Sequence, residues 1–265
     1  MTNWISGDCE ANGIAIHYLR TGGRKPPLIA LHGLAGSGAR WIPLARALEG
    51  DCDVVAPDAR GHGKSNAPRR GYLYRDHTSD VIGLIKALGL AGPVLLGHSM
   101  GGMTAAVAAS QIAGLRGVIL ADPTFLSPER QREVHESDVV ERHRRLLGSS
   151  RSAALAEARL RHPHRSSEVV ELMVDARRET SMNAFEVLAP PNPDYRASVR
   201  AICVPILLVI GDRGVVSLET ARELQSLNPR LRCERIPDAG HGLPYDQPDR
   251  FAAVVRVFLR SLAAP

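Results

Sequence analysis

Short, almost wholly apolar runs alternate along this chain with longer stretches in which apolar residues recur at helical spacing. Four of the runs have the length of a strand: residues 27–31, 53–57, 115–121 and 205–212. In the longer stretch 75–88, Val81, Leu84 and Leu88 fall on one side of a helix. Strands that are apolar on both sides and separated by helices are typical of a parallel sheet covered on both faces. The pattern therefore predicts an α/β fold.

The two ends of the chain extend this pattern. Residues 8–21 alternate about Asn12-Gly13, a pair favoured in two-residue hairpin turns, and they predict an antiparallel pair of strands. Near the other end we expect a strand at about 232–236 and a closing helix that begins at Pro248, a favoured first-turn residue. Further helices are expected at residues 39–48, at residues 102–113 and after Ser217.

The alternation stops between residues 126 and 188. This stretch contains 11 arginines and 11 acidic residues, its apolar residues are sparse, and no run in it resembles a strand. We interpret it as a helical insertion that lies over the edge of the sheet as a cap, with its charged residues on solvated outer faces. The expected organisation is a core formed by residues 1–125 and 189–265, with the cap at 126–188.

Composition narrows the functional classes. With 265 residues, 44% of them hydrophobic, the chain suits one soluble globular domain, and it lacks the run of about 18 apolar residues that spans a membrane. All but three of its 33 basic residues are arginines dispersed among 28 acidic residues, which indicates compositional bias and not a nucleic-acid-binding stripe. The first residues lack the pattern of a signal peptide, so we expect a cytoplasmic location.

The four cysteines stand singly, without a C-x-x-C pair and without histidines at the spacing of a zinc site. We expect free, buried thiols and no bound metal. Oligomeric state has no signal in the sequence.

One turn carries a candidate for chemistry. The apolar run after Pro93 predicts a strand, residues 102–113 predict a helix, and between them lies Gly97-x-Ser99-x-Gly101. So sharp a turn leaves no room for side chains at the two glycines, and it turns the serine hydroxyl out of the sheet. Ser99 is therefore the candidate nucleophile. Because a serine hydroxyl is a poor nucleophile near neutral pH, it needs an oriented base and donors for the oxyanion.

Several motifs make the chain resemble the α/β-hydrolase fold family over nearly its whole length. In chain order they are His32-Gly33, Asp58-x-Arg60-Gly61-His62-Gly63-x-Ser65, Gly97-His98-Ser99-Met100-Gly101 and Ala239-Gly240-His241. The resemblance implies an eight-stranded, mostly parallel sheet with helices on both faces and a cap inserted after the sixth strand. It also implies that the active site lies between the sheet and the cap.

The resemblance assigns roles to single residues as well. Ser99 would be the nucleophile and His241 its general base. The backbone N–H groups of Leu34 and Met100 would stabilise the oxyanion. Structural roles would fall to His32, Asp58 and Arg60.

The acid that orients His241 has two candidates. Family members commonly place it three residues after the glycine that ends the seventh strand, and here that position is Gly214. Asp212 is nearby but out of register, whereas Asp122, after the sixth strand, occupies an alternative position that some capped members use. Either residue gives the order Ser, acid, His. We predict that Asp122 orients His241, because Asp212 lies so early in its loop that a turn or cap bond is more natural for it.

A serine nucleophile disfavours mechanisms that need an aspartate there, such as epoxide hydrolysis. The main prediction is a hydrolase that cleaves a small carboxylic ester or lactone through an acyl-enzyme and needs no cofactor. Thioester hydrolysis and peroxy-acid formation would use the same site. The alternatives are carbon–carbon bond hydrolysis of a diketone-type substrate and, because of Gly214, a degenerate scaffold that binds a ligand. We expect the apolar wall of the pocket to include Met173, Met182 and Phe185.

Overall fold

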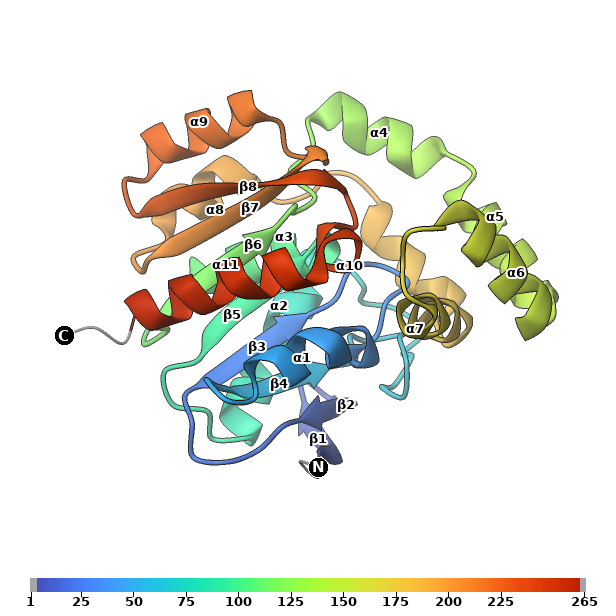
Figure 1. Ribbon diagram of the computed structural model, residues 1–265, viewed down its shortest axis with the longest axis horizontal. Coiled ribbons are helices and arrows are strands. Elements are labelled where there is room, and N and C mark those ends of the chain that lie inside the picture. Colours follow the sequence, from blue (N-terminus) through green and yellow to red (C-terminus); the bar gives the residue numbers. More distant parts are fainter. Residues whose placement is uncertain (1–3, 263–265) are drawn as a thin grey trace.

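The structure is a computed structural model that describes residues 4–262. Residues 1–3, which belong to the stretch considered above for a signal peptide, and residues 263–265, at the end of the expected core, lie outside the described residues. The centre of the fold is one β-sheet, shown in Figure 1. Its strands are β1 (Ile5–Ala11), β2 (Ile14–Arg20), β3 (Pro27–Leu31), β4 (Asp53–Pro57), β5 (Val94–His98), β6 (Gly117–Ala121), β7 (Ile206–Arg213) and β8 (Leu231–Gly240).

The order of the strands confirms the predicted eight-stranded, mostly parallel sheet. Across the sheet the order is β1-β2-β4-β3-β5-β6-β7-β8. Strand β2 pairs antiparallel with β1 and with β4, while every other pair of neighbours is parallel. The carboxyl ends of β5, β6, β7 and β8 therefore lie at the same edge, where an open parallel sheet presents its functional groups.

Helices cover both faces of the sheet (Figure 1). Helices α1 and α11 pack on one face, and α2, α3, α8 and α9 pack on the other. With two short helices, η1 and α10, the helices outside residues 126–188 are η1 (Gly38–Trp41), α1 (Ile42–Leu48), α2 (Tyr74–Ala87), α3 (Met100–Ala109), α8 (Tyr195–Ala201), α9 (Leu218–Leu227), α10 (Leu243–Asp246) and α11 (Pro248–Ser261). As predicted, Pro248 begins the last helix and the Ser217 side chain caps α9 by accepting the Thr220 N–H.

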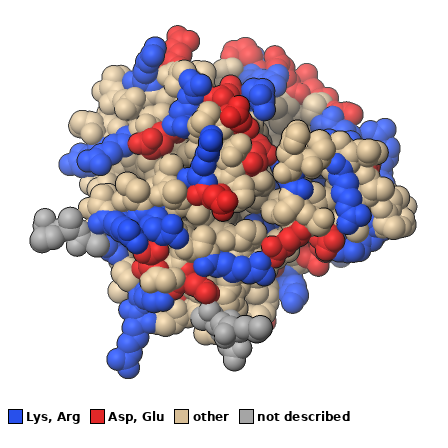
Figure 2. All heavy atoms as spheres, in the orientation of Figure 1, with Lys and Arg blue, Asp and Glu red and all other residues tan. Residues whose placement is uncertain are grey.

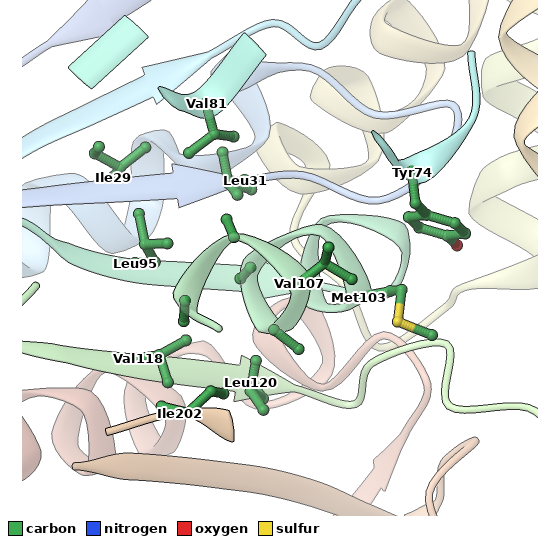
Figure 3. Packing of buried hydrophobic residues seen from close by; sticks show 14 of the residues in the cluster. Ile29, Leu31, Tyr74, Val81, Leu95, Met103, Val107, Val118, Leu120 and Ile202 are labelled. Carbon is green, nitrogen blue, oxygen red and sulfur yellow. The ribbon is translucent and has the colours of Figure 1, made fainter. Parts of the chain in front are cut away.

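Successive residues of a central strand face opposite layers of helices. In β3, Leu28 and Ala30 belong to the buried cluster that includes Phe251 of α11. Ile29 belongs to the cluster on the other face, which includes Met103 of α3, and Figure 3 shows it beside Leu95 of β5. These side chains are completely buried on both sides of the sheet. The continuous apolar runs in the sequence follow from this arrangement, because neither side of such a strand faces water.

Two elements differ from their predicted limits, and both differences bear on the site. Helix α3 begins at Met100, directly after Ser99, instead of at residue 102, and it ends at Ala109. Strand β8 continues to Gly240 instead of ending near residue 236, because it pairs with β7 as far as Arg213. His241 therefore follows the carboxyl end of β8 without an intervening loop.

Residues 126–188, which lie between β6 and α8, are mostly helical, and in Figure 1 their helices lie together on one side of the molecule. Helix α7 contacts η1 of the core, and α5 contacts η2. The role of this segment as a cap stays a prediction. Its elements are α4 (Pro128–Glu136), α5 (Val139–Gly148), α6 (Arg151–Arg161), α7 (Ser167–Arg178) and the 3-10 helix η2 (Met182–Leu188).

The surface carries both signs of charge. Figure 2 shows Lys and Arg side chains interspersed with Asp and Glu over the face in view. Within residues 4–262, no helix combines the length and the apolarity needed to cross a bilayer. The cysteines are free, but only Cys52 is fully buried; Cys203 is exposed, contrary to the prediction, because it lies in the connection that leads into β7.

Candidate active site

Ser99 lies at the turn between β5 and α3 in a strained backbone conformation. Its φ is 57° and its ψ is −120°, a left-handed geometry that side chains rarely adopt. The flanking glycines make the turn possible: a Cβ at Gly97 would lie 2.0 Å from the Gly101 carbonyl oxygen, and one at Gly101 would lie 2.3 Å from the Leu31 carbonyl oxygen. The sequence pattern is thus explained by steric contact between the turn and the adjoining strands.

His241 contacts both Ser99 and Asp122. Its Nε2 lies 2.9 Å from Ser99 Oγ, and its Nδ1 lies 2.6 Å from Asp122 Oδ2. A carboxylate oxygen only accepts, so Nδ1 carries the proton and Nε2 is free to accept the Ser99 hydroxyl proton. The structure therefore brings together Ser99, His241 and Asp122 from three different parts of the chain.

Asp122 is the fully buried member of this group. Its carboxylate accepts hydrogen bonds from the backbone N–H groups of Val215 (2.8 Å to Oδ2) and Val216 (3.0 Å to Oδ1), in addition to His241. These donors compensate for the loss of water around a buried charge. A Cβ at Gly214 would lie 2.5 Å from Asp122 Oδ1. The glycine at the common acid position therefore leaves room for the carboxylate that arrives from β6.

Asp212 lies elsewhere. Its Oδ1 accepts from Arg235 Nε at 2.6 Å and its Oδ2 accepts from the Asp238 N–H at 2.9 Å. The backbone N–H of Asp238 holds the pKa of Asp212 below its usual value, with a further contribution from Arg235. The carboxylate thus joins β7 to β8. Asp212 lies within β7, so this contact between strands takes the place of the turn or cap bond that was expected for it.

His98 holds the backbone of His241. Its Nε2 donates to the His241 carbonyl oxygen at 2.7 Å, and the two rings lie 5.0 Å apart between centroids. Burial, followed by the neighbouring His241 ring, lowers the pKa of His98 well below its usual value. No role for His98 was predicted from the sequence, although its place directly before Ser99 was a signal that it could contact the site.

The loop after β3 places Leu34 beside Ser99. Leu34 and Met100 both border the same cavity as Ser99 and His241. Within residues 4–262, neither the Leu34 N–H nor the Met100 N–H donates to another group of the chain. Ala35, next in the loop, has a φ of 57°, so this loop is also held in a left-handed conformation.

Two buried histidines hold this loop in place. His32 Nε2 accepts the Ala59 N–H at 2.9 Å, and His62 Nε2 accepts the Ala35 N–H at 3.1 Å. Burial lowers the pKa of His32 to about 4 and the pKa of His62 to about 3. Both rings are therefore uncharged at neutral pH, as acceptors of an N–H must be.

The other two residues expected to be structural make contacts of that kind. Asp58 Oδ1 accepts the Gly38 N–H at 2.7 Å, and its Oδ2 accepts the Lys64 N–H at 2.9 Å. The Arg60 guanidinium forms a buried ion pair with Asp80, in which its Nε donates to Oδ2 at 2.6 Å. Neither side chain borders the cavity.

A cavity of about 400 Å³ opens above Ser99 and His241. Of the three residues expected in the pocket wall, Met173 and Phe185 border this cavity and Met182 does not; contact with a substrate stays a prediction. Met182 begins η2 directly after Ser181, whose N–H donates to the Gly61 carbonyl oxygen, so this end of η2 is held against the core. Among the described residues, no three His, Cys, Asp or Glu side chains are grouped to hold a metal ion.

Besides Ser99 and His241, the polar residues of the cavity wall were not predicted from the sequence; they are Arg40, Tyr74, Thr124, Arg130, Gln131, Arg177 and Asn192. The Tyr74 hydroxyl and Thr124 Oγ1 lie 3.0 Å apart, while Arg40 and Arg177 bring positive charge to the wall. The expectation that the charges of residues 126–188 lie on the surface is wrong for Arg177, whose Nε is buried. Nothing in the sequence distinguishes it from the other arginines of this segment.

Comparisons with known proteins agree with this fold. The sequence profile of the alpha/beta hydrolase fold matches residues 26–248. N-formylmaleamate deformylase of Pseudomonas putida is 30% identical over 98% of both chains. The enol-lactonase of Burkholderia xenovorans LB400 superposes with a TM-score of 0.79 at 26% identity, covering 96% of this chain and 100% of that one. E-2-(acetamidomethylene)succinate hydrolase, at 23% identity, superposes with a TM-score of 0.85 over 97% and 100% of the two chains and shows the same fold. The chain belongs to the α/β-hydrolase fold family.

Proposed function

We propose that this protein is a serine hydrolase that cleaves a carboxylic ester or lactone through an acyl-enzyme. The observation that carries the proposal is the hydrogen-bonded series from Asp122 through His241 to Ser99, with separations of 2.6 and 2.9 Å. A lone serine is a poor nucleophile. This series supplies it with a proton acceptor and with an anion that stabilises the charged imidazole.

In the first half-reaction, Ser99 Oγ attacks the carbonyl carbon of the substrate while His241 Nε2 takes the hydroxyl proton. The oxyanion that forms would accept hydrogen bonds from the N–H groups of Leu34 and Met100, which have no other acceptor within residues 4–262. His241 then gives the proton to the leaving oxygen, the carbon–oxygen bond breaks, and the acyl group stays on Ser99.

In the second half-reaction, a water molecule loses a proton to His241 Nε2 and attacks the acyl carbonyl. The second tetrahedral intermediate collapses, the carboxylic acid leaves, and Ser99 recovers its proton. Asp122 stays ionised throughout, keeps the proton of His241 on Nδ1, and stabilises the imidazolium. The cycle needs no cofactor.

The structure gives little support to the alternative of a degenerate scaffold. That alternative depends on the missing acid at Gly214, yet the Asp122 carboxylate lies where a side chain at position 214 would begin. A fluorophosphonate probe tests the point directly. We expect one adduct, on Ser99, in the folded protein, and none after unfolding in urea or in Ser99→Ala. Folded wild-type protein that stays unlabelled would contradict an activated serine.

A second candidate is hydrolysis of an amide or formyl group. The observation that favours it is the 30% identity, over 98% of both chains, to a protein named as a deformylase. The same acyl transfer applies, with His241 protonating a leaving nitrogen instead of an oxygen. Comparing kcat/KM for aryl esters, lactones, N-formyl amides and a diketone-type substrate ranks these reactions, including the carbon–carbon cleavage kept from the sequence analysis.

We also propose that residues 126–188 act as a cap that shapes the pocket. Met173 of α7 and Phe185 of η2 both border the cavity that contains Ser99. Most of the apolar residues that line the cavity therefore come from residues 126–188. Residues 1–125 and 189–265 would form the core that holds the catalytic residues.

Replacing Phe185 by alanine should change the preference for acyl-chain length by about 10-fold, because apolar pocket contacts discriminate by about this much per group. Hydrolysis of a minimal acetate ester should change little. The measurement is kcat/KM for a series of 4-nitrophenyl esters from acetate to octanoate. Leu160→Ala is the control within the same segment, because Leu160 is 84% exposed. The centres of the Phe185 and His143 rings lie 4.6 Å apart. Equal losses on every ester would therefore show that Phe185 stabilises the fold through such packing and does not select the substrate.

For the location of the protein we propose the cytoplasm. The four cysteines are all free, and proteins of reducing compartments keep their thiols in this state.

A further inference from the structure

Two arginines border the cavity without a carboxylate to pair with. Arg40 lies in η1, shortly after the loop that holds Leu34, and Arg177 lies near the end of α7, which contacts η1. The Nε atoms of both are buried and have no hydrogen-bond partner within the described part of the chain. Placing an unpaired cation out of water is costly. Both side chains are only partly buried, so their unpaired guanidinium groups leave a positively charged wall that favours an anion.

Two acids close to the arginines are already paired, and Glu179, which ends α7, is exposed and does not line the cavity. Asp246 binds Arg165 at 2.6 Å, and Asp175 of α7 binds Arg151 at 2.6 Å. Among the described residues that line the cavity there is no aspartate or glutamate. The two arginines are therefore available to an anion that occupies the cavity.

The residues around Arg40 hold its guanidinium in place, and the positive charges of Arg40 and Arg177 repel each other. The Arg40 Cζ lies 4.0 Å from the centre of the Tyr245 ring, a stacking contact that holds the guanidinium plane. Burial lowers the pKa of Arg177, and the charges of Arg161 and Arg40 lower it further. An anion bound between Arg40 and Arg177 would offset the part of this repulsion that comes from Arg40.

From this cavity we infer that the substrate carries a carboxylate separate from the bond cleaved at Ser99, and that Arg40 and Arg177 bind it. The inference rests on the proposed acyl transfer. A guanidinium matches a planar carboxylate with two parallel N–H donors, which favours this anion. A cavity of about 400 Å³ suits a small molecule. Its carbon skeleton would lie against the apolar side chains of Phe185, Val187 and Leu188.

The test compares two esters of the same shape. Mono-4-nitrophenyl glutarate carries the carboxylate, and 4-nitrophenyl 5-methylhexanoate carries an uncharged isopropyl group in its place. Wild-type protein should hydrolyse the glutarate ester with a kcat/KM about 10- to 100-fold higher, the range that hydrogen bonds to a charged group provide. Equal values for the two esters, or a preference for the neutral one, would overturn the inference.

The arginines are then tested one at a time. Arg40→Met and Arg177→Met should each lower kcat/KM for the glutarate ester by about 10- to 100-fold while changing the neutral ester by less than about threefold. Arg130→Met is the matched control, because Arg130 also borders the cavity but is exposed and already pairs with Glu133. It should affect the two esters equally. If Arg40→Met and Arg177→Met lower both rates to the same extent, the arginines serve structure, not recognition.

Binding without turnover separates this inference from the proposed chemistry. Glutarate should bind Ser99→Ala in calorimetry, and its Kd should rise about 10-fold or more when Arg177→Met is added. Arg177→Lys should restore part of the affinity, since it keeps the charge but not the paired donors. If neither ester is hydrolysed but glutarate binds in this way, the acyl transfer fails and the anion site stands. If inorganic phosphate binds more tightly than glutarate, the assignment to a carboxylate is wrong.

Discussion

Replacing Ser99 by alanine is expected to lower kcat for an ester substrate by about 10⁶-fold, the loss found when a serine nucleophile is removed from an intact catalytic group. The reason is chemical: His241 would have no hydroxyl to deprotonate, and no acyl-enzyme could form. The measurement is hydrolysis of 4-nitrophenyl acetate by purified wild-type and variant protein. Intact-protein mass spectrometry with a slow ester should show the acyl adduct on wild-type protein alone.

The control for this variant is a serine on the same helix. Ser110 caps the far end of α3 and donates to the Val107 carbonyl oxygen, away from the cavity. Ser110→Ala should keep its activity within about twofold of wild type, as surface substitutions usually do. If Ser99→Ala retains most of the hydrolytic rate while remaining folded, Ser99 is not the nucleophile.

Replacing Asp122 by asparagine should lower kcat by about 10⁴-fold, as the corresponding change does in serine proteases. The hydrogen bonds explain why. Asp122 Oδ1 accepts from the Val216 N–H, so the asparagine oxygen would take this place and turn its NH₂ group toward His241 Nδ1. His241 would then carry its proton on Nε2 and could not accept the Ser99 proton.

Asp212→Asn provides the comparison that decides between the two candidate acids. Asp212 contacts Arg235 and the Asp238 N–H, not His241, so its replacement should change kcat by no more than about twofold. Circular dichroism and thermal unfolding establish that both variants are folded. A large loss in Asp212→Asn with little loss in Asp122→Asn would reverse the assignment.

Much of the fold could be predicted because its signals are local. Each central strand is a continuous apolar run, since both of its sides are buried, and the Asn12-Gly13 pair marks the hairpin between β1 and β2. The ends of elements were less accurate. The length of β8 depends on its pairing with β7 as far as Arg213. That pairing joins two segments separated by a helix and leaves no periodic signal.

Part of the candidate site could be predicted from the sequence because its signals are also local. Gly97 and Gly101 mark the Ser99 turn because contacts within and beside that turn exclude side chains. In contrast, the place of Met182 follows from the Ser181 N–H bond to the Gly61 carbonyl oxygen, which joins distant parts of the chain. Arg177 likewise became a candidate only because α7 packs against η1, so that Arg177 borders the cavity with its Nε buried.

The sequence by itself determined the α/β class, the turn at Ser99 and the loops that begin at His32 and Asp58. These features depend on apolar periodicity and on residues that are neighbours along the chain. Only the tertiary structure decided how the candidate acids are placed, which side chains line the cavity, and which arginines lack an acid. Asp122 reaches His241 because β6, β7 and β8 are adjacent in a parallel sheet and end at one edge. Such contacts depend on how distant segments pack, and the spacing of residues along the chain does not indicate this packing.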